Sequence, residues 1–281
     1  MSLQFIMGNS GSGKSHYLYE TVVQEAAKNP NKNYLVIVPE QFTMQTQKDL
    51  CLAHPRGGIM NIDVLSFGRL AHRIFEEVGQ DARTVLDDEG KSLILRKIAG
   101  ACEKDLKVFR GNLKKQGYIS EVKSVISEFT QYGVDFDLLD DFMEEIPFES
   151  YLYYKLDDIR TIYQSFEEYL SEKYITKEEM LDVLSDVVPH SDILKGSVVA
   201  MDGFTGFTPV QNRLIGELFS VCEKVMITVE MDGREDPYVY RDPYQLFAIG
   251  KQMVTSLVKI AKEKKTEIDD AVCFYERPVY R

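Results

Sequence analysis

A glycine-rich stretch near the amino terminus limits the possible folds of this chain more than any other feature. Residues Leu3 to Ser15 read LQFIMGNSGSGKS, an apolar run followed by a match to G-x-x-x-x-G-K-[ST]. Glycines at this spacing let backbone N–H groups approach a phosphate, and the helix that follows adds the positive end of its dipole. The stretch therefore predicts a strand, a phosphate-binding loop (P-loop) and a helix. The alternative is a Gly/Ser-rich turn before an ordinary helix.

The residue types in this loop predict an ATP–Mg²⁺ site. We expect Lys14 to reach the β- and γ-phosphates and the Ser15 hydroxyl to ligate Mg²⁺. The predicted nucleotide-binding residues are Gly8, Asn9, Ser10, Gly11, Ser12, Gly13, Lys14 and Ser15. Whether a bound nucleotide is hydrolysed is a separate question, and no residue is assigned as catalytic.

The order of the predicted elements indicates an α/β fold with a large insertion. Apolar runs at 34–38, 62–65, 197–202 and 223–230 are typical of strands in a parallel sheet. The pattern between them is helical from about Leu86 to Val188, too long for a simple crossover. We expect an α/β P-loop domain over 1–85 and 191–281, and an inserted helical domain over 86–190. A helix from Asp242 or Pro243 to about Lys264 and a last strand from Ile268 to Tyr275 complete the first domain.

Asp202 ends the apolar run at 197–202, which is the form of a Walker B strand. The acid in such a strand orients the water shell of Mg²⁺ across from the P-loop serine. A simple strand-end cap is the alternative. Active ATPases commonly place a Glu beside this acid to position the attacking water, and here Gly203 follows instead.

Several residues that follow the predicted strands have side chains suited to single-stranded DNA. Ligands of open α/β sheets bind beyond the carboxyl ends of the strands, and single strands are held by aromatic stacking and cationic side chains. Alternatives remain open: Thr43 as a helix cap, Phe67 as the start of a core stripe, and Phe204 and Phe207 as core residues. The candidates are Gln41, Thr43, Phe67, Arg69, Phe204 and Phe207.

The charge of the chain is concentrated in one segment. The net charge is −12, and residues 135–190 hold 16 acidic and 4 basic side chains, so this segment carries the whole excess. A solvated helical face is one reading. A docking surface for a basic partner, or a barrier that keeps DNA away, is the other.

Composition also limits the location and the metal chemistry of the chain. No run of 18 apolar residues and no signal-peptide pattern occurs, so neither a membrane span nor secretion is predicted. The four cysteines are widely spaced without a C-x-x-C pair, which favours reduced thiols in the cytoplasm over a zinc or iron–sulfur site. The histidines have no metal-ligand spacing.

Five stretches together resemble one known family. They are MSLQFIMGNSGSGKS, VPEQFT after the second strand, VLSFGRLAHRIF, LDDEGKSLILRKI and VVAMDGFTGFTPVQNRLI. Across nearly the whole chain they look like the amino-terminal part of AddB proteins, the B subunits of ATP-dependent helicase/nucleases that process DNA double-strand breaks. VPEQFT combined with the P-loop is specific for this family, whereas the P-loop alone would not be.

The resemblance implies a fold, partners and a function. The fold is a superfamily 1 helicase first motor domain, with a RecA-like sheet (1A) and an all-helical insertion (1B). An AddB protein pairs with an AddA-type motor and binds single- and double-stranded DNA, including the recombination hotspot Chi. Its nuclease domain and iron–sulfur cluster lie in a carboxy-terminal part that is absent here.

One departure from the active helicases suggests a degenerate motor. Asp202 aligns with the acid of their D-E-x-Q-D run, but Gly203 stands at the catalytic Glu and Gly206 at the second Asp. We therefore expect a domain that binds nucleotide and DNA with weak or no ATPase activity and no nuclease activity alone. Two alternatives are an autonomous P-loop enzyme, such as an ATPase or a small-molecule kinase, and a structural domain with an empty P-loop.

Overall fold

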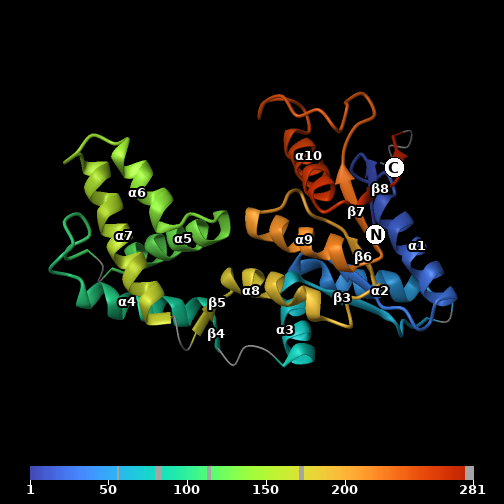
Figure 1. Ribbon diagram of the computed structural model, residues 1–281, viewed down its shortest axis with the longest axis horizontal. Coiled ribbons are helices and arrows are strands. Elements are labelled where there is room, and N and C mark those ends of the chain that lie inside the picture. The colour runs from blue at the N-terminus through green and yellow to red at the C-terminus, as the bar shows by residue number, and fades with distance from the viewer. Residues whose placement is uncertain (56, 80–83, 113–114, 171–173, 276–281) are drawn as a thin grey trace. The chain divides into compact units, whose positions relative to one another are not determined.

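The chain forms two compact units in the computed structural model. The structure describes residues 1–55, 57–79, 84–112, 115–170 and 174–275. One unit combines Met1–Gln80 with Leu181–Arg281, and the other comprises Asp81–Met180 (Figure 1). The second unit is therefore inserted in sequence between the two parts of the first.

A parallel sheet organises the first unit. In the described part of the chain it runs in the order β3-β2-β6-β7-β1-β8, and β9 also pairs with β1. Every pairing is parallel. The strands are β1 (Ser2–Gly8), β2 (Tyr34–Ile37), β3 (Ile62–Leu65), β6 (Val198–Met201), β7 (Lys224–Glu230), β8 (Glu267–Ile268) and β9 (Val272–Phe274). The prediction of an α/β fold with a parallel central sheet is confirmed.

The sheet is covered by helices because its middle strands are apolar on both faces. All four residues of β2 and of β6 are buried, as expected of continuous apolar runs in a parallel sheet. The helices of this unit are α1 (Lys14–Lys28), α2 (Thr43–Ala53), α3 (Phe67–Val78), α9 (Pro209–Val221) and α10 (Ala248–Glu263). Helix α8 (Glu179–Val187) begins at the junction of the two units and leads into the 3₁₀ turn Val188–His190.

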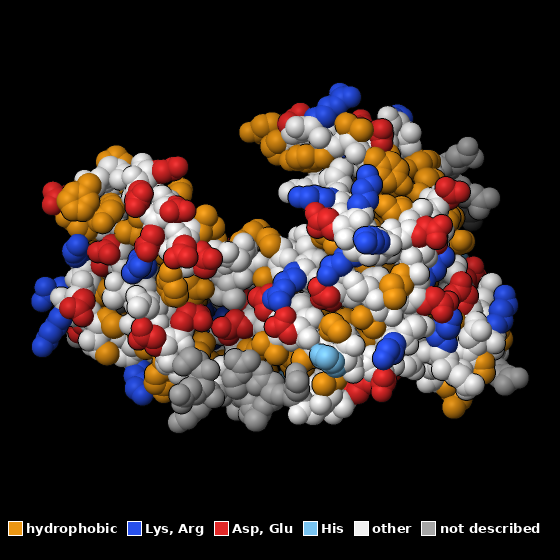
Figure 2. Space-filling view, viewed as in Figure 1, with side chains coloured by type: hydrophobic (Ala, Val, Ile, Leu, Met, Phe, Trp, Pro, Cys, Tyr) orange, Lys and Arg blue, Asp and Glu red, His pale blue; other side chains and the backbone are white. Residues whose placement is uncertain are grey.

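The inserted unit is not entirely helical, which corrects the expected all-helical insertion. It contains α4 (Asp88–Ala101), α5 (Gln116–Tyr132), α6 (Phe136–Glu144) and α7 (Tyr151–Leu170). It also holds a parallel pair of short strands, β4 (Thr84–Leu86) and β5 (Tyr174–Thr176). Three-residue strands are too short to produce a recognisable period-2 pattern, so they could not be predicted. Acidic and exposed hydrophobic side chains lie over α6 and α7 (Figure 2).

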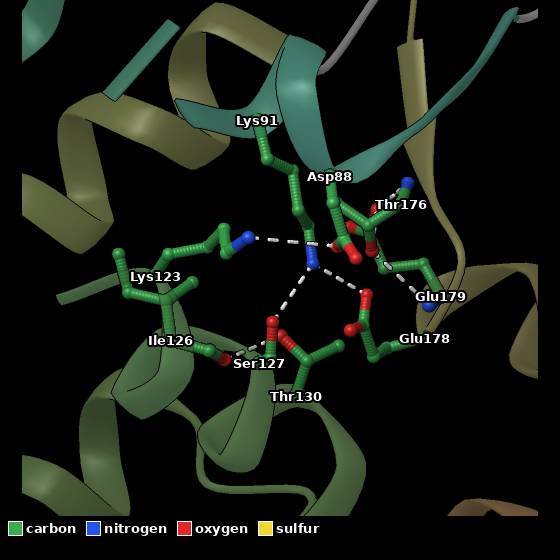
Figure 3. Close-up of polar contacts among 9 residues, drawn as sticks. All are labelled: Asp88, Lys91, Lys123, Ile126, Ser127, Thr130, Thr176, Glu178 and Glu179. Atoms are coloured by element: carbon green, nitrogen blue, oxygen red, sulfur yellow. Dashed lines mark hydrogen bonds and ion pairs between the residues drawn. The ribbon is translucent and has the colours of Figure 1, made fainter. Parts of the chain in front are cut away.

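A buried ion pair fixes part of this unit. Lys91 as a whole is 3% exposed. Its Nζ donates to Ser127 Oγ at 2.9 Å and to Glu178 Oε2 at 2.6 Å (Figure 3). Nearby, Thr176 and Glu179 form a capping box: the Thr176 N–H donates to Glu179 Oε2 at 2.7 Å, and the Glu179 N–H donates to Thr176 Oγ1 at 3.2 Å. The box therefore satisfies two backbone donors at a helix start.

Two element boundaries near the carboxyl end differ from the prediction. Helix α10 begins at Ala248, because Asp242 Oδ1 accepts from the Tyr244 N–H in a local turn and Phe247 adopts φ 57°. The expected last strand is split into β8 and β9, and Asp269 between them donates its N–H to the Leu3 carbonyl at 2.9 Å. Within the residues described, each helix is too short or too polar to cross a lipid bilayer.

Candidate functional site

The candidate residues of the first unit lie at one edge of the sheet. The predicted P-loop follows β1, Gln41 and Thr43 follow β2, Ser66 to Arg69 follow β3, and Asp202 to Phe207 follow β6. Because the strands are parallel, their carboxyl ends share an edge, where ligands of open α/β sheets bind. Strand β7 lies between the P-loop strand β1 and the Asp202 strand β6.

The glycines of the predicted P-loop have separate structural roles. Gly13 is the N-cap of α1 with φ 96°, and Gly11 has φ 71°; both lie in the left-handed region that favours glycine. Gly8 is required for close approach, since a Cβ there would lie 2.6 Å from Ser12 Oγ and 2.7 Å from the Phe274 carbonyl oxygen. The loop therefore turns into α1 with the first N–H groups of the helix free of side-chain caps.

Lys14 points back onto its own loop. Its Nζ donates to the Gly8 carbonyl at 2.8 Å and to the Asn9 carbonyl at 2.7 Å. An ammonium group has three donors, so one proton remains for an anion. Burial lowers the pKa of Lys14, and the carboxylates of Glu230 and Asp202 oppose that shift. A phosphate beside this ammonium would further favour its charged form.

Asp202 is held by three hydroxyl groups. Its side chain is buried, at 6% exposure. Oδ1 accepts from Ser15 Oγ at 3.1 Å and from Thr228 Oγ1 at 2.6 Å, and Oδ2 accepts from the Tyr19 hydroxyl at 2.6 Å. Ser15 of the predicted P-loop and Asp202, the predicted Walker B acid, are thus direct neighbours although they are 187 positions apart in sequence. This is the arrangement in which the pair can share a Mg²⁺ ion.

Tyr19 and Thr228 belong to the site and were missed by the sequence analysis. Tyr19 lies one helical turn after Ser15, so both side chains face the same side of α1. Thr228 is the polar residue within the otherwise apolar interior of β7, residues 225–229. A polar side chain in a buried strand needs a partner, and that signal alone could have selected Thr228. Burial and then the Asp202 carboxylate raise the pKa of Tyr19.

Gly203, which follows Asp202 where the sequence comparison expects a catalytic Glu, has a left-handed backbone. It has φ 77°, and a Cβ there would meet Pro39 Cδ at 3.5 Å and Phe42 Cδ2 at 3.6 Å. Those distances are ordinary contacts, so the left-handed backbone, more than lack of space, disfavours other residues here. The backbone after Asp202 is therefore adapted to glycine.

The three predicted stacking aromatics form one cluster. The ring centroids of Phe67 and Phe204 are 5.4 Å apart, those of Phe204 and Phe207 are 5.1 Å apart, and those of Phe67 and Phe207 are 6.3 Å apart. Phe67 is 8% exposed and also contributes to the buried side of α3. Phe204 and Phe207 are half-buried. The cluster leaves the latter two rings partly available to a ligand, while Phe67 packs against them from the core.

The polar candidates after β2 and β3 are arranged differently from one another. Gln41 is exposed. Thr43 is buried, and its hydroxyl donates to the Glu40 carbonyl at 2.9 Å, while Phe42 is the N-cap of α2. Arg69 Nε lies 3.2 Å from Glu40 Oε1 in an exposed ion pair. Gln41 and Arg69 therefore present polar groups to solvent at this edge, whereas Thr43 is occupied by its own turn.

A pocket of about 430 Å³ adjoins the aromatic cluster. Its wall contains Phe204 and Thr205 from the loop after β6 and Glu230 from the end of β7. The start of α10 closes the other side with Phe247, Ala248 and Ile249. The pocket size falls in the range of small-molecule sites.

The donor set fits an ATP–Mg²⁺ group. The fit rests on the remaining Lys14 donor, on the uncapped amino end of α1, and on the Ser15–Asp202 contact. In addition, the Ser12 hydroxyl is buried and forms no hydrogen bond in the described structure. Glycine-lined N–H groups, an ammonium and a serine–aspartate pair are the chemistry that triphosphates and Mg²⁺ need.

Fold and site together define an α/β protein whose candidate site lies at the carboxyl edge of a parallel sheet, and whose sequence carries an inserted, mainly helical unit. Comparison with known families makes this specific. The family model described as "ADDB, N-terminal" matches residues 5–280. The chain belongs to this family.

Relatives with similar sequences share one description, the B subunit of an ATP-dependent helicase/deoxyribonuclease. The protein of Lachnoclostridium phytofermentans is 46% identical over 268 residues, which is 95% of this chain and 23% of the relative. That of Clostridium acetobutylicum is 33% identical over 281 residues, covering 100% of this chain and 24% of the relative. The protein of Clostridium kluyveri is 34% identical over 281 residues, which is 100% of this chain and 24% of the relative. The chain thus spans about a quarter of the length of the relatives it matches.

Proposed function

We propose that this chain is the nucleotide- and DNA-binding amino-terminal part of an AddB-type protein, acting within an ATP-dependent helicase and nuclease. The observation that carries the proposal is the Ser15–Asp202 contact of 3.1 Å beside the P-loop. ATP–Mg²⁺ would be held by residues 8–15, with Ser15 and Asp202 at the metal. When bound, the ion would neutralise phosphate charge.

The first unit is proposed to be a RecA-like motor domain of the superfamily 1 helicases, and the inserted unit to be the counterpart of their 1B domain. The parallel sheet, the P-loop after β1 and the acid after β6 support this assignment. Gly203 supports a degenerate motor, because no carboxylate follows Asp202 to position an attacking water. The domain would bind ATP and hydrolyse it weakly or not at all.

Single-stranded DNA is proposed to cross the carboxyl edge of the sheet. Phe204 and Phe207 would stack on bases, and Gln41 and Arg69 would contact the backbone. The partner would be an AddA-type motor and nuclease protein, since relatives described as B subunits imply a complex with a second chain. Recognition of Chi and a cytoplasmic location are parts of the same proposal.

Nucleotide binding is the first test. A fluorescent ATP analogue should bind the wild-type chain in the presence of Mg²⁺, and Lys14→Ala should weaken binding at least about tenfold, equivalent to about 1.4 kcal/mol. Lys28→Ala, on the exposed end of the same helix, is the matched control and should bind normally. Equal binding by the two variants would reject the P-loop site. No binding by the wild type would favour a structural domain with an empty P-loop.

DNA binding and hydrolysis are tested separately. Arg69→Ala should weaken binding of a labelled single-stranded oligonucleotide and lower the slope of its salt dependence by about one. Arg73→Ala is the control, since Arg73 lies on the same helix and pairs with Asp63 at 2.9 Å. If both arginine variants bind like wild type, the proposed strand path is wrong. Rapid ATP turnover by the isolated chain would refute the degenerate motor.

A further inference from the structure

The junction of α6 and α7 carries an unusual density of negative charge. Residues 135–154 contain seven acidic side chains and no Lys or Arg. Asp140 is neutralised by a two-pronged contact with Arg160, and Asp135 caps α6 by accepting from the Leu138 N–H. The other five acids form no ion pair within the described residues, and all are exposed: Asp137, Asp141, Glu144, Glu145 and Glu149.

Large apolar side chains are exposed in the same segment. Leu138 and Phe142 are 51% and 52% exposed and lie four residues apart on α6, so they share one face. The adjacent side of the helix is the buried one, with Leu139 and Met143. Phe142 and Leu138 thus do not belong to the core of the unit. Two exposed apolar residues on one helical turn are a typical anchor for a docked helix.

The turn into α7 extends this apolar surface. Phe148 and Tyr151 are 74% and 73% exposed, and Leu152 is about half exposed. Phe148 is held in place by an edge-on contact with the Tyr153 ring, at 5.1 Å between centroids. Phe142 near the end of α6 and Phe148, Tyr151 and Leu152 around the start of α7 lie near the junction of the two helices, and Leu138 lies one helical turn before Phe142. Figure 2 shows hydrophobic and acidic side chains together over these helices. We call these five residues and the five free acids the α6–α7 surface.

We propose that the α6–α7 surface is a docking site for a basic amphipathic helix of a partner protein. Exposed apolar groups rimmed by charges of one sign are characteristic of protein interfaces. The negative charge of the surface favours a basic partner, because the five unpaired carboxylates attract Lys and Arg side chains. Asp141 lies three residues after Leu138, and Glu145 three residues after Phe142, so acidic and apolar side chains share one side of the helix.

Charge also argues against the other macromolecules that might cover this surface. DNA and anionic membranes would be repelled by the unpaired carboxylates. A second copy of the chain would bring the same acidic surface against itself in a two-fold contact, which places like charges together. The occupant is therefore a positively charged protein segment with apolar residues on one face. This inference does not depend on nucleotide or DNA binding by the first unit.

The test uses three synthetic helical peptides and the 281-residue chain. One peptide has a Leu face and a Lys face, one has Leu and Glu faces, and one has Lys and Ser without an apolar face. Binding is followed by fluorescence anisotropy of a label on the peptide. We expect the Leu/Lys peptide to bind at least about tenfold more tightly than the other two, a difference of about 1.4 kcal/mol.

Substitutions in the α6–α7 surface test where the Leu/Lys peptide binds. Leu138→Ala/Phe142→Ala and Glu144→Gln/Glu145→Gln should each weaken binding of the Leu/Lys peptide at least about fivefold, because interface anchors and paired charges contribute about 1 kcal/mol or more. The matched controls are Leu93→Ala on α4, where Leu93 is 65% exposed, and Glu121→Gln/Glu128→Gln on α5. These controls should bind like wild type. Equal losses in test and control variants would overturn the proposal.

Hydrogen exchange gives a second readout that does not depend on substitutions. The Leu/Lys peptide should slow amide exchange in residues 136–152 of the wild-type chain. Protection elsewhere, with none in this segment, would overturn the proposal. Protection of the segment by a single-stranded oligonucleotide or by anionic vesicles would also overturn it. The same holds if sedimentation shows a dimer of the chain that Phe142→Asp converts to a monomer.

Discussion

Tyr19→Phe removes the hydroxyl group that holds Asp202 in the candidate site and that also lies 3.3 Å from Thr46 Oγ1. The Tyr19 ring is 8% exposed and stays in the core of the variant, while the hydroxyl that donates to Asp202 Oδ2 at 2.6 Å is removed. A hydrogen bond to a charged acceptor contributes about 1.5–3 kcal/mol, and the variant leaves a buried carboxylate oxygen short of a donor. We therefore expect the free energy of unfolding to fall by about 2–3 kcal/mol.

Urea denaturation followed by circular dichroism measures this change. With a slope on the order of 2 kcal/mol per molar urea, the midpoint of the transition should fall by about 1 M. Tyr17→Phe on the same helix is the matched control. The Tyr17 ring lies 5.2 Å from that of Phe274, and its hydroxyl forms no hydrogen bond with the described residues. Its free energy of unfolding should change by less than about 0.5 kcal/mol.

The same bond predicts a pH dependence with a definite sign. Because burial and Asp202 raise the pKa of Tyr19 above its ordinary value of 10.0, the folded chain keeps a proton that the unfolded chain loses. The stabilisation is complete below about pH 10 and decreases as the pH rises further. The difference between wild type and Tyr19→Phe should therefore narrow above pH 10. Equal effects of the two Phe variants, or a difference that stays constant to pH 11, would refute this account of the site.

Three further predictions concern single residues. Gly203→Ala should lower the free energy of unfolding by about 1–2 kcal/mol because the backbone at φ 77° is left-handed. Gly203→Asn should lower it by less, because Asn tolerates this conformation better. A thermal unfolding experiment in which the Ala variant is the more stable of the two would contradict the strain argument. Burial and the neighbouring Glu179 raise the pKa of Glu167 to about 7. The folded chain therefore keeps a proton that the unfolded chain loses near pH 4.5, and the free energy of unfolding of wild type should fall between about pH 4.5 and 7. Urea titrations at about pH 5 and pH 8 should show this fall relative to Glu167→Gln, which has no carboxyl group at this position. Asp158→Ala removes the acceptor of the Lys107, Val108 and Phe109 N–H groups and should lower the free energy of unfolding by more than about 3 kcal/mol. Asp157→Ala is the control: it removes an exposed ion pair with Lys107 and should lower the free energy of unfolding by less than about 1 kcal/mol.

The parallel sheet was predictable because its strands are coded locally. Continuous apolar runs such as Tyr34–Ile37 and Val198–Met201 need no knowledge of the rest of the chain. The start of α10 was not predictable in the same way, since Leu246 and Ile249 fit an apolar stripe but are exposed. The turn at Asp242 and the left-handed Phe247 override that pattern. Short-range polar bonds of this kind compete with helix formation.

The candidate site was predictable only where a motif fixes residue spacing. Residues 8–15 and Asp202 could be placed by pattern, but their mutual contact depends on the order of strands, which no local pattern gives. Tyr19 and Thr228 join the site because α1 and β7 bring them to Asp202 from positions 183 and 26 residues away. The pairing of Arg69 with Glu40 likewise depends on β2 and β3 being neighbours.

The position of β1 in the sheet has a consequence for the order in which this chain folds during synthesis. Strand β1 is made long before its neighbours β7, β8 and β9, which begin at Lys224, Glu267 and Val272. At about 5–20 residues per second, β1 waits on the order of 10 seconds or longer at the ribosome without a strand to pair with. The contiguous range Asp81–Met180 has all its own contacts much earlier. The loop at residues 8–15 thus leaves the ribosome before β7, β8 and β9, and it is among the last parts of the first unit to reach its final form.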